Sequence, residues 1–356
     1  MRNRAIASGF VWAAVLAIAT LTVSGQTPAP APKPGVLKPR PAAPKPSTAG
    51  SQPYTSKTPW GHPDLQGVWS NATTTPLERP DNVAAKGELS DAEAEKLGRE
   101  VAARRNTDNA PAAGDPGTYN EFWWERGNIL KQPALIVDPP DGRLPPLTPE
   151  GQRRAAAYTQ AMKGRGQADS WTDRNLHERC ILYHGVPPLP TGYNNNYQIL
   201  QTRDHVVIRY EMLADQRIIP LDGRPHLGSR IRSWMGDARA RWEGDTLVVE
   251  TTNFNEGAGG IYELGSRAVT SLQGNGDTLR VVERFRRTDK DTIDYRFTVN
   301  DPTLFTKPWS GSIPMKRFDE QIYEYACHEG NYALDHMLSG ARASEAKAAG
   351  SDKTKK

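Results

Sequence analysis

Apolar and polar residues alternate strictly between positions 293 and 299 of this chain. Ile293, Tyr295, Phe297 and Val299 form the apolar set, and Asp294, Arg296 and Thr298 form the polar set. This alternation is typical of a strand with one face buried and one face wet. Similar runs, separated by turn residues, occur at 197–201, 205–212, 217–220, 240–242, 246–254, 279–287 and 321–326.

These runs predict a mainly β domain at 196–340. With turns between consecutive runs, the simplest arrangement is an antiparallel meander of about seven or eight strands. We expect the meander to close as a barrel or to stack as a sandwich, because either arrangement removes exposed sheet edges.

Two helices are predicted in an N-terminal extension, residues 54–195, which we expect to pack on the sheet. A capping box at 90–93 predicts a helix over residues 90–105. The sequence Thr-Pro-Glu at 148–150 supplies an N-cap and a proline in the first turn, and it predicts a helix that ends at about residue 163.

Both ends of the chain differ in composition from the middle. Residues 1–25 have a basic start, an apolar run and small residues at the end, which is the pattern of a signal peptide. The Pro/Ala-rich stretch 26–53 is predicted to be a disordered tether, and the tail 341–356 is expected to fray. We therefore expect a periplasmic or secreted protein; an uncleaved membrane anchor is the alternative.

Net charge excludes one class of partner. The chain has 45 basic and 41 acidic residues, a net charge of +4, and no run of Lys or Arg within the predicted folded part. A nucleic-acid binder would need such a run, so we expect no nucleic acid as partner and no membrane span after signal cleavage. Most arginines alternate with acidic residues, which predicts cross-strand ion pairs on a solvated face.

The two cysteines, Cys180 and Cys327, are predicted to form a disulfide, because an exported protein folds under oxidising conditions. A zinc site that adds His184 and His328 is the alternative. Adjacent residues on a strand point to opposite faces, which disfavours Cys327 and His328 as joint ligands. We therefore expect no metal and no cofactor.

Two hairpin segments, WEGDTLVVE at 242–250 and GDTLRVVE at 276–283, are similar to the repeated hairpins of lipocalin-like and fatty-acid-binding barrels. The resemblance covers residues 240–300. It implies a lipocalin-like, up-and-down barrel with an interior pocket.

Four further motifs resemble a family of secreted bacterial proteins of unknown function. They are PDLQGVW at 63–69, GYNNNY at 192–197, WMGD at 234–237 and CHEGNY at 327–332. This resemblance covers residues 60–340, and it implies export and a single folding unit.

Acid/base chemistry is assigned to four residues. His328 and Glu329 follow the last predicted strand, where a loop can present side chains to the mouth of a pocket. His226 and Arg230 belong to the most polar loop of the β region, 222–237. A loop held together by its own hydrogen bonds and ion pairs is the alternative interpretation for each of them.

Ligand binding is assigned to six other residues. Arg224, Trp234 and Asp237 lie in the loop 222–237, whose arginines could hold an anionic or sugar-like ligand by bidentate hydrogen bonds. The others, which the disulfide would bring near His328, are His184, Tyr193 and Asn195. The alternative for the asparagine run at 194–196 is turn chemistry.

The sequence contains no Gly-x-Ser-x-Gly, Gly-x-Gly-x-x-Gly, Walker, His-Glu-x-x-His or Cys-x-x-Cys-His motif. Our leading hypothesis is a protein that binds a small molecule in a pocket ringed by the polar loops. An acid/base enzyme such as a lyase, hydratase, isomerase or hydrolase on the same scaffold is the second hypothesis. The third is an envelope interaction protein that uses the aromatic segment 119–125. The oligomeric state stays open.

Overall fold

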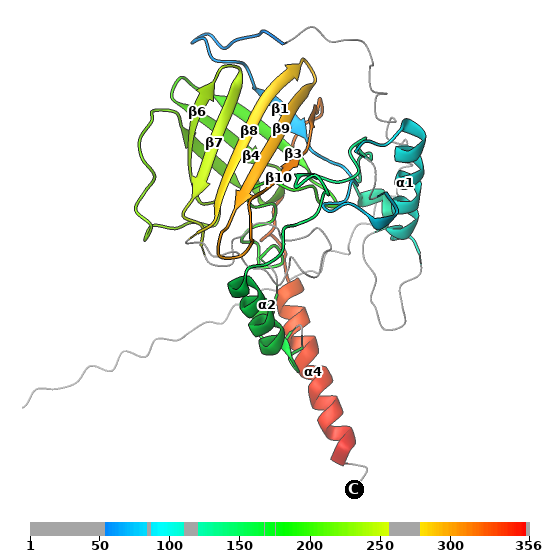
Figure 1. Ribbon diagram of the computed structural model, residues 1–356. Helices are drawn as coiled ribbons and strands as arrows, with labels where there is room; N and C mark the ends of the chain where they lie inside the picture. The colour runs from blue at the N-terminus through cyan, green and yellow to red at the C-terminus, as the bar shows by residue number, and fades with distance from the viewer. Residues whose placement is uncertain are drawn as a thin grey trace, which may run out of the picture. The chain divides into compact units, whose positions relative to one another are not determined.

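The alternating runs of the second half of the chain fold into one curled antiparallel sheet (Figure 1). The computed structural model describes residues 54–83, 87–109, 120–166, 168–174, 176–255 and 278–353. The predicted signal peptide and tether lie outside these residues. Within them the sheet has 11 strands. They are β1 (Gly67–Ser70), β2 (Ile136–Asp138), β3 (Asn196–Gln201), β4 (His205–Tyr210), β5 (Gln216–Pro220), β6 (Asp237–Glu243), β7 (Thr246–Thr252), β8 (Arg280–Asp289), β9 (Thr292–Asn300), β10 (Trp309–Ser312) and β11 (Met315–Arg317).

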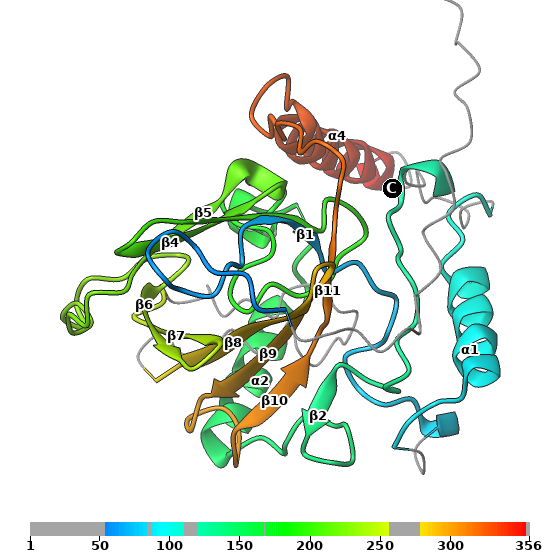
Figure 2. The same ribbon diagram turned by 90° about the horizontal axis from the view of Figure 1, so that it is seen from above.

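The sheet curls into a nearly closed barrel. Its main path runs β5, β4, β3, β1, β11, β9, β8, β7 and β6; off this path, β10 pairs with β9, and β2 pairs with β10. The end strands β5 and β6 approach each other without hydrogen bonding. In Figure 2, β5, β4 and β1 form one wall, and β6 to β9 form the wall that faces it. The predicted mainly β, barrel-like architecture is confirmed.

Inward-facing side chains fill the barrel. The register of β8 and β9 places Phe285 opposite Tyr295, so both rings point inward. The largest side chains that are less than 2 % exposed are aromatic: Trp69, Trp309, Tyr197, Tyr210, Tyr295, Phe254, Phe285 and Phe297. At this degree of burial, almost no space large enough for a water molecule lies beside them. The interior pocket that the lipocalin resemblance implies is therefore not formed around these residues.

The N-terminal extension is part of the barrel, and the predicted boundary at residue 196 does not separate two units. β1 lies between β3 and β11 and pairs with both. Trp69 of β1 is fully buried, and its indole N–H donates to the carbonyl oxygen of Leu65 at 3.0 Å. The guanidinium of Arg287 stacks on the Trp69 ring at 4.9 Å. Residues Ser51–Lys356 form one compact unit.

The described residues include three α-helices, and two of these match the sequence prediction. α1 (Asp91–Arg104) begins at the capping box of Ser90 and Glu93 and buries Leu97 and Val101 in a small separate cluster. α2 (Pro149–Met162) has Thr148 as its N-cap. Short 3-10 helices lie at Asp81–Val83, Glu121–Trp123, Trp171–Asp173 and Met212–Ala214.

The third helix, α4 (Ala333–Lys353), occupies much of the tail that we expected to fray. Alanine and lysine are strong helix formers, and Arg342 pairs with Glu345 within this helix. Arg342 also donates to the carbonyl oxygens of Ala168 and Asp169, which ties α4 to the segment after α2.

The strand predicted at 321–326 is wrong, and the final strands are β10 and β11. The half-buried positions Ile322 and Tyr325 are three residues apart, a spacing that does not match the period of two. Both edges of β11 already pair, one with β1 and the other with β9, so β11 offers no free edge to a further strand.

The predicted disulfide is present between Cys180 and Cys327, with a Cα–Cα distance of 5.8 Å. It joins the loop before β3 to the turn before α4 across a sequence separation of 147 residues. No helix in the described ranges has both the length and the apolar content to cross a bilayer.

Candidate functional site

The outer face of β6 to β9 carries charged side chains in rows that cross the strands. The register places Arg241 of β6 and Arg284 of β8 on either side of Val248 of β7. Arg284 stands directly opposite Arg296 of β9. Like charges in directly opposite positions destabilise a sheet, so this row requires negative charge nearby.

The neighbouring row begins with a carboxylate on β6. Glu243 binds Arg241 at 2.6 Å and Arg284 at 2.9 Å. These hydrogen bonds, that of Arg284 foremost, lower the pKa of Glu243, so its carboxylate is ionised at neutral pH.

A second carboxylate, Asp294 of β9, is shared in the same way. It lies 3.2 Å from Nε of Arg296 and 3.6 Å from Nη2 of Arg286. Four guanidinium groups thus surround two carboxylates, and the six side chains together carry an excess of two positive charges. We call them the arginine cluster: Arg241, Glu243, Arg284, Arg286, Asp294 and Arg296.

A surface hollow of about 270 Å³ lies within the arginine cluster. The three arginines in its wall are about half-exposed, which leaves guanidinium N–H groups accessible to a ligand. A guanidinium presents planar, paired donors that match the oxygens of carboxylate, sulfate or phosphate. The hollow is lined by Thr246, Arg284, Arg286, Asp294 and Arg296.

A neighbouring ion pair on the same face is balanced. Arg280 of β8 donates two hydrogen bonds to Glu250 of β7, at 2.7 and 2.5 Å. The hydrogen bond from Arg280 is the main reason that the pKa of Glu250 is lowered. One arginine here meets one carboxylate, so this pair lacks the charge excess of the arginine cluster.

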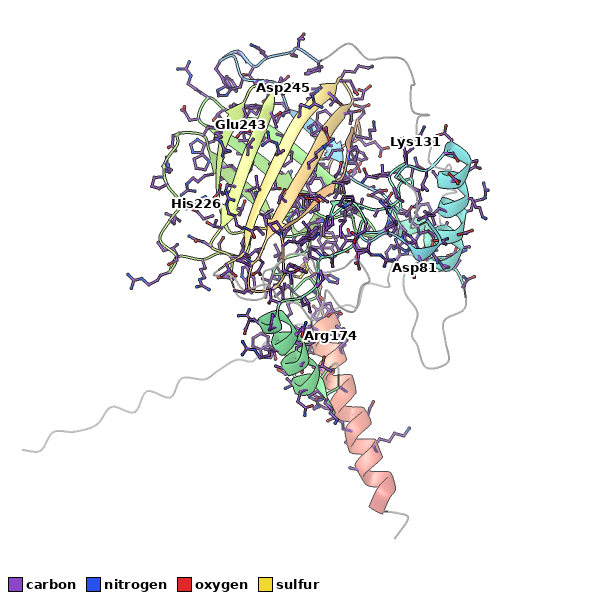
Figure 3. The ribbon with its side chains drawn as sticks, in the orientation of Figure 1. Asp81, Lys131, Arg174, His226, Glu243 and Asp245 are labelled. Atoms are coloured by element: carbon purple, nitrogen blue, oxygen red, sulfur yellow. A yellow bond between two sulfur atoms is a disulfide. The ribbon has the colours of Figure 1, made fainter. Side chains whose placement is uncertain are left out.

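His226 and Asp237, two of the predicted site residues, lie together. The Nδ1–H of His226 donates to Asp237 Oδ2 at 2.9 Å, and Nε2 lies 3.8 Å from Glu250 Oε1. In Figure 3, His226 lies beside the β6–β7 hairpin, whose turn carries Glu243 and Asp245. Asp237 orients the imidazole, and the ring joins the connection between β5 and β6 to the outer face of the sheet.

The other predicted residues of the loop 222–237 have separate surroundings. Arg224 is exposed and forms a bidentate pair with Asp222. Arg230 is exposed, whereas Trp234 is half-buried and packs against the main core. Of the predicted site residues in this loop, His226 and Asp237 are the two that the described structure brings into direct contact.

His328 and Glu329 are exposed residues of the turn beside the disulfide. The Glu329 N–H donates to the carbonyl oxygen of Ala326, and the Asn331 N–H donates to that of His328. In the part of the chain that the structure describes, no hydrogen bond or ion pair joins these residues to His226 or Arg230. The four residues assigned to acid/base chemistry thus do not form one group, and the enzyme hypothesis stays a prediction.

The three predicted ligand residues before β3 take part in the packing of their own loop. The ring nitrogens of His184 lie 3.1 Å from the carbonyl oxygens of Leu189 and Asn194. Asn195 is fully buried, and its amide binds both the N–H and the carbonyl oxygen of Thr191. The contacts of Asn195 agree with the turn interpretation of the asparagine run.

Tyr193, the third of these residues, packs against an aromatic side chain of the extension. Its ring makes an edge contact with Trp124, with 5.8 Å between the ring centroids. Trp124 also covers Gly192 so closely that a Cβ atom there would lie 1.9 Å from the indole ring. This contact therefore requires glycine at position 192.

A buried polar network inside the barrel was not predicted from the sequence. Arg217 of β5 donates to Glu283 of β8 at 3.0 Å and to Thr251 of β7 at 3.0 Å. The Tyr295 hydroxyl donates to Glu283 at 3.0 Å. This network joins β5 to the facing wall of the barrel at the place where β5 and β6 do not pair.

The aromatic segment after residue 119 presents two large side chains to solvent. Phe122 and Trp123 are 64 % and 61 % exposed and contact each other edge to face. Their exposure agrees with the interaction-surface hypothesis. Of the described residues, no three His, Cys, Asp or Glu side chains are grouped so that they could hold a metal ion.

Comparisons of the chain with family models, with curated proteins and with solved structures found no match.

Proposed function

We propose that this protein binds a small anionic molecule in the hollow of the arginine cluster. The observation that carries the proposal is the sharing of two carboxylates, Glu243 and Asp294, among four arginines. A bound carboxylate, sulfate or phosphate group would neutralise the remaining positive charge. It would also relieve the repulsion between the opposed Arg284 and Arg296.

The proposal places the ligand on the outer face of the barrel, because aromatic side chains fill the described interior. It keeps the small-molecule hypothesis of the sequence analysis and moves the site from the polar loops to the strands β8 and β9. We further propose that binding takes place outside the cytoplasm. The N-terminal signal pattern and the Cys180–Cys327 disulfide support this location.

Isothermal titration calorimetry with inorganic phosphate, sulfate and citrate at low ionic strength tests the proposal. Arg296→Gln and Arg284→Gln should each weaken binding of the preferred anion about five- to tenfold, the effect of one partly exposed charge-assisted hydrogen bond. Added salt should weaken binding as well, because it screens exposed charges.

Arg280→Gln is the matched control, since Arg280 lies on the same face of β8 and its ion-pair partner in the described chain is Glu250. Binding to this variant should stay within about twofold of the wild type. An equal loss in all three variants would indicate general charge attraction and contradict the proposed site. Failure of all three anions to bind at millimolar concentration would contradict it as well.

A further inference from the structure

The connection between β5 and β6 exposes two aliphatic side chains at its tip. Leu227 is 46 % exposed and Ile231 is 58 % exposed. In Figure 2 this connection projects away from the barrel next to β6. Single exposed aliphatic residues are common, but two on one projecting tip form a small apolar surface that nothing else in the described structure covers.

Hydrogen bonds fix the backbone of this tip. Asp237 Oδ2 accepts the N–H of Leu227 at 2.9 Å, and the Asn253 side chain donates to the carbonyl oxygen of Leu227 at 2.8 Å. A turn follows, in which the Ile231 N–H donates to the carbonyl oxygen of Gly228 at 2.8 Å. Leu227 and Ile231 are therefore exposed by an ordered loop.

The base of the loop is joined to the end of β7. The Ser233 N–H donates to the carbonyl oxygen of Asn253, and the Asn255 N–H donates to that of Ser233. Gly236 has a positive φ of 69°, and a Cβ there would lie 2.6 Å from Thr251 Cγ2. The loop is thus held at both its base and its tip.

Basic residues outnumber acidic ones in the segment that carries the apolar tip. Arg224, Arg230 and Arg232 lie within nine residues of one another, and Asp222 is the acidic residue of this stretch. The segment 222–232 therefore carries two excess positive charges. Arginines can extend their guanidinium groups toward phosphate head groups while their aliphatic stems lie along the apolar boundary.

We propose that the segment 222–232 docks on a lipid bilayer that contains anionic phospholipids, with Leu227 and Ile231 inserted at the boundary between head groups and acyl chains. A narrow, ordered tip with two aliphatic side chains and flanking arginines suits insertion between lipids. A protein partner would ordinarily require a broader surface. This inference concerns a different surface from the arginine cluster and does not depend on the anion site.

The experiment places an environment-sensitive NBD label at the tip of the full-length chain. Both native cysteines are in the disulfide, so Leu227→Cys introduces one reactive thiol. Vesicles of phosphatidylcholine with about 30 mol% phosphatidylglycerol should raise NBD emission several-fold and shift it to the blue. Phosphatidylcholine vesicles should give at most a fifth of this response, and about 0.5 M NaCl should remove most of it.

Ile218→Cys is the matched control, because Ile218 of β5 is 63 % exposed and lies outside the basic segment. Its label should not respond, whereas the label at 227, and a second one introduced by Ile231→Cys, should respond. The comparison also separates insertion of the loop from any membrane binding by the N-terminus, which would bring all labels near the vesicle without burying the tip.

Two unlabelled variants test the side chains in a vesicle co-sedimentation assay. The control Leu200→Ser/Ile218→Ser removes two exposed aliphatic residues of the sheet. Relative to that control, Leu227→Ser/Ile231→Ser should lower the partition coefficient at least tenfold. Arg230→Gln should lower it about fivefold, which corresponds to about 1 kcal/mol for one basic residue near an anionic surface.

Four results would overturn the inference, three of them with vesicles alone. One is a silent label at 227 with both vesicle types, and another is an equal response at 218 and 227. The third is an equal response to neutral and anionic vesicles. A label at 227 that responds only to an added protein fraction would assign the tip to a protein partner and would overturn the inference as well.

Discussion

Removing one partner of the buried ion pair Arg217–Glu283 should destabilise the protein far more than removing an exposed charge from the same strand. The two side chains are 2 % and 0 % exposed. Burial alone would lower the pKa of Arg217, but the attraction of Glu283 outweighs burial and raises it. Arg217 therefore stays charged, and Glu283→Met would leave this charge in the barrel without a counter-ion.

The expected size of the effect follows from this burial. Loss of one partner of a buried, hydrogen-bonded ion pair costs about 3–5 kcal/mol of the free energy of unfolding. Glu283→Met also removes the acceptor of the Tyr295 hydroxyl, and Arg217→Met leaves the Glu283 carboxylate with that hydroxyl as a donor. The double variant removes both charges, and its cost should lie within about 2 kcal/mol of zero.

Equilibrium unfolding in urea, followed by tryptophan fluorescence, measures these differences. The matched control is the pair between Arg280 of β8 and Glu250 of β7, whose side chains are 47 % and 25 % exposed; Arg280→Met and Glu250→Met should each cost less than about 1 kcal/mol. The reasoning fails if either single variant at 217 or 283 costs less than about 1 kcal/mol. It also fails if the double variant costs the sum of the two, since that would show no coupling.

Two further predictions concern pH and redox state. Burial raises the pKa of Asp215 to about 7, despite a hydrogen bond from the backbone of Tyr183. The native state therefore holds a proton that the unfolded state releases near pH 4, and stability falls by about 2–4 kcal/mol as the pH rises from about 4 to 7. Asp215→Asn should remove this pH-dependent loss of stability, as measured by the unfolding free energies of wild type and variant between about pH 4 and 7. If the difference between the two free energies did not change with pH, the prediction would be contradicted. Reduction of the Cys180–Cys327 disulfide should lower the unfolding free energy by roughly 2–5 kcal/mol. Thermal unfolding with and without a reductant measures this change, and an unchanged melting temperature would contradict the prediction.

Local patterns in the sequence predicted the parts of the fold that depend on neighbouring residues. The alternation of Ile293 and Tyr295 with polar residues gave the inward and outward faces of β9, and the capping box gave the start of α1. The disulfide followed from the expected compartment. These features need no knowledge of distant contacts.

The buried network could not be predicted, because its polar residues contact one another across the barrel. Arg217 and Glu283 stand at inward positions of their strands, where the pattern predicts apolar residues. A polar residue at such a position is stable only with a buried partner, here 66 residues away in the sequence. Sequence alone does not identify that partner.

The arginine cluster depends on register. The sequence predicts ion pairs on the outer face, but the opposition of Arg284 and Arg296 follows from the pairing of β8 with β9. This pairing shifts between Arg287 and Asp289, where an irregularity changes the register at the end of the hairpin. Such a bulge has no reliable sequence signature, and a shift of one residue would move every side chain to the other face.

The position of β1 sets the order in which this molecule can be completed. Trp69 of β1 pairs with Tyr197 of β3 on one side and with Arg317 of β11 on the other. The barrel wall is therefore continuous only when β1 has paired with β11, which is synthesised about 250 residues later. The chain must be synthesised as far as Arg317 before β1 and β11 can pair. Until β11 has been synthesised, one edge of β1 consequently has no partner strand. A chain that terminates before β11 would keep this edge unpaired.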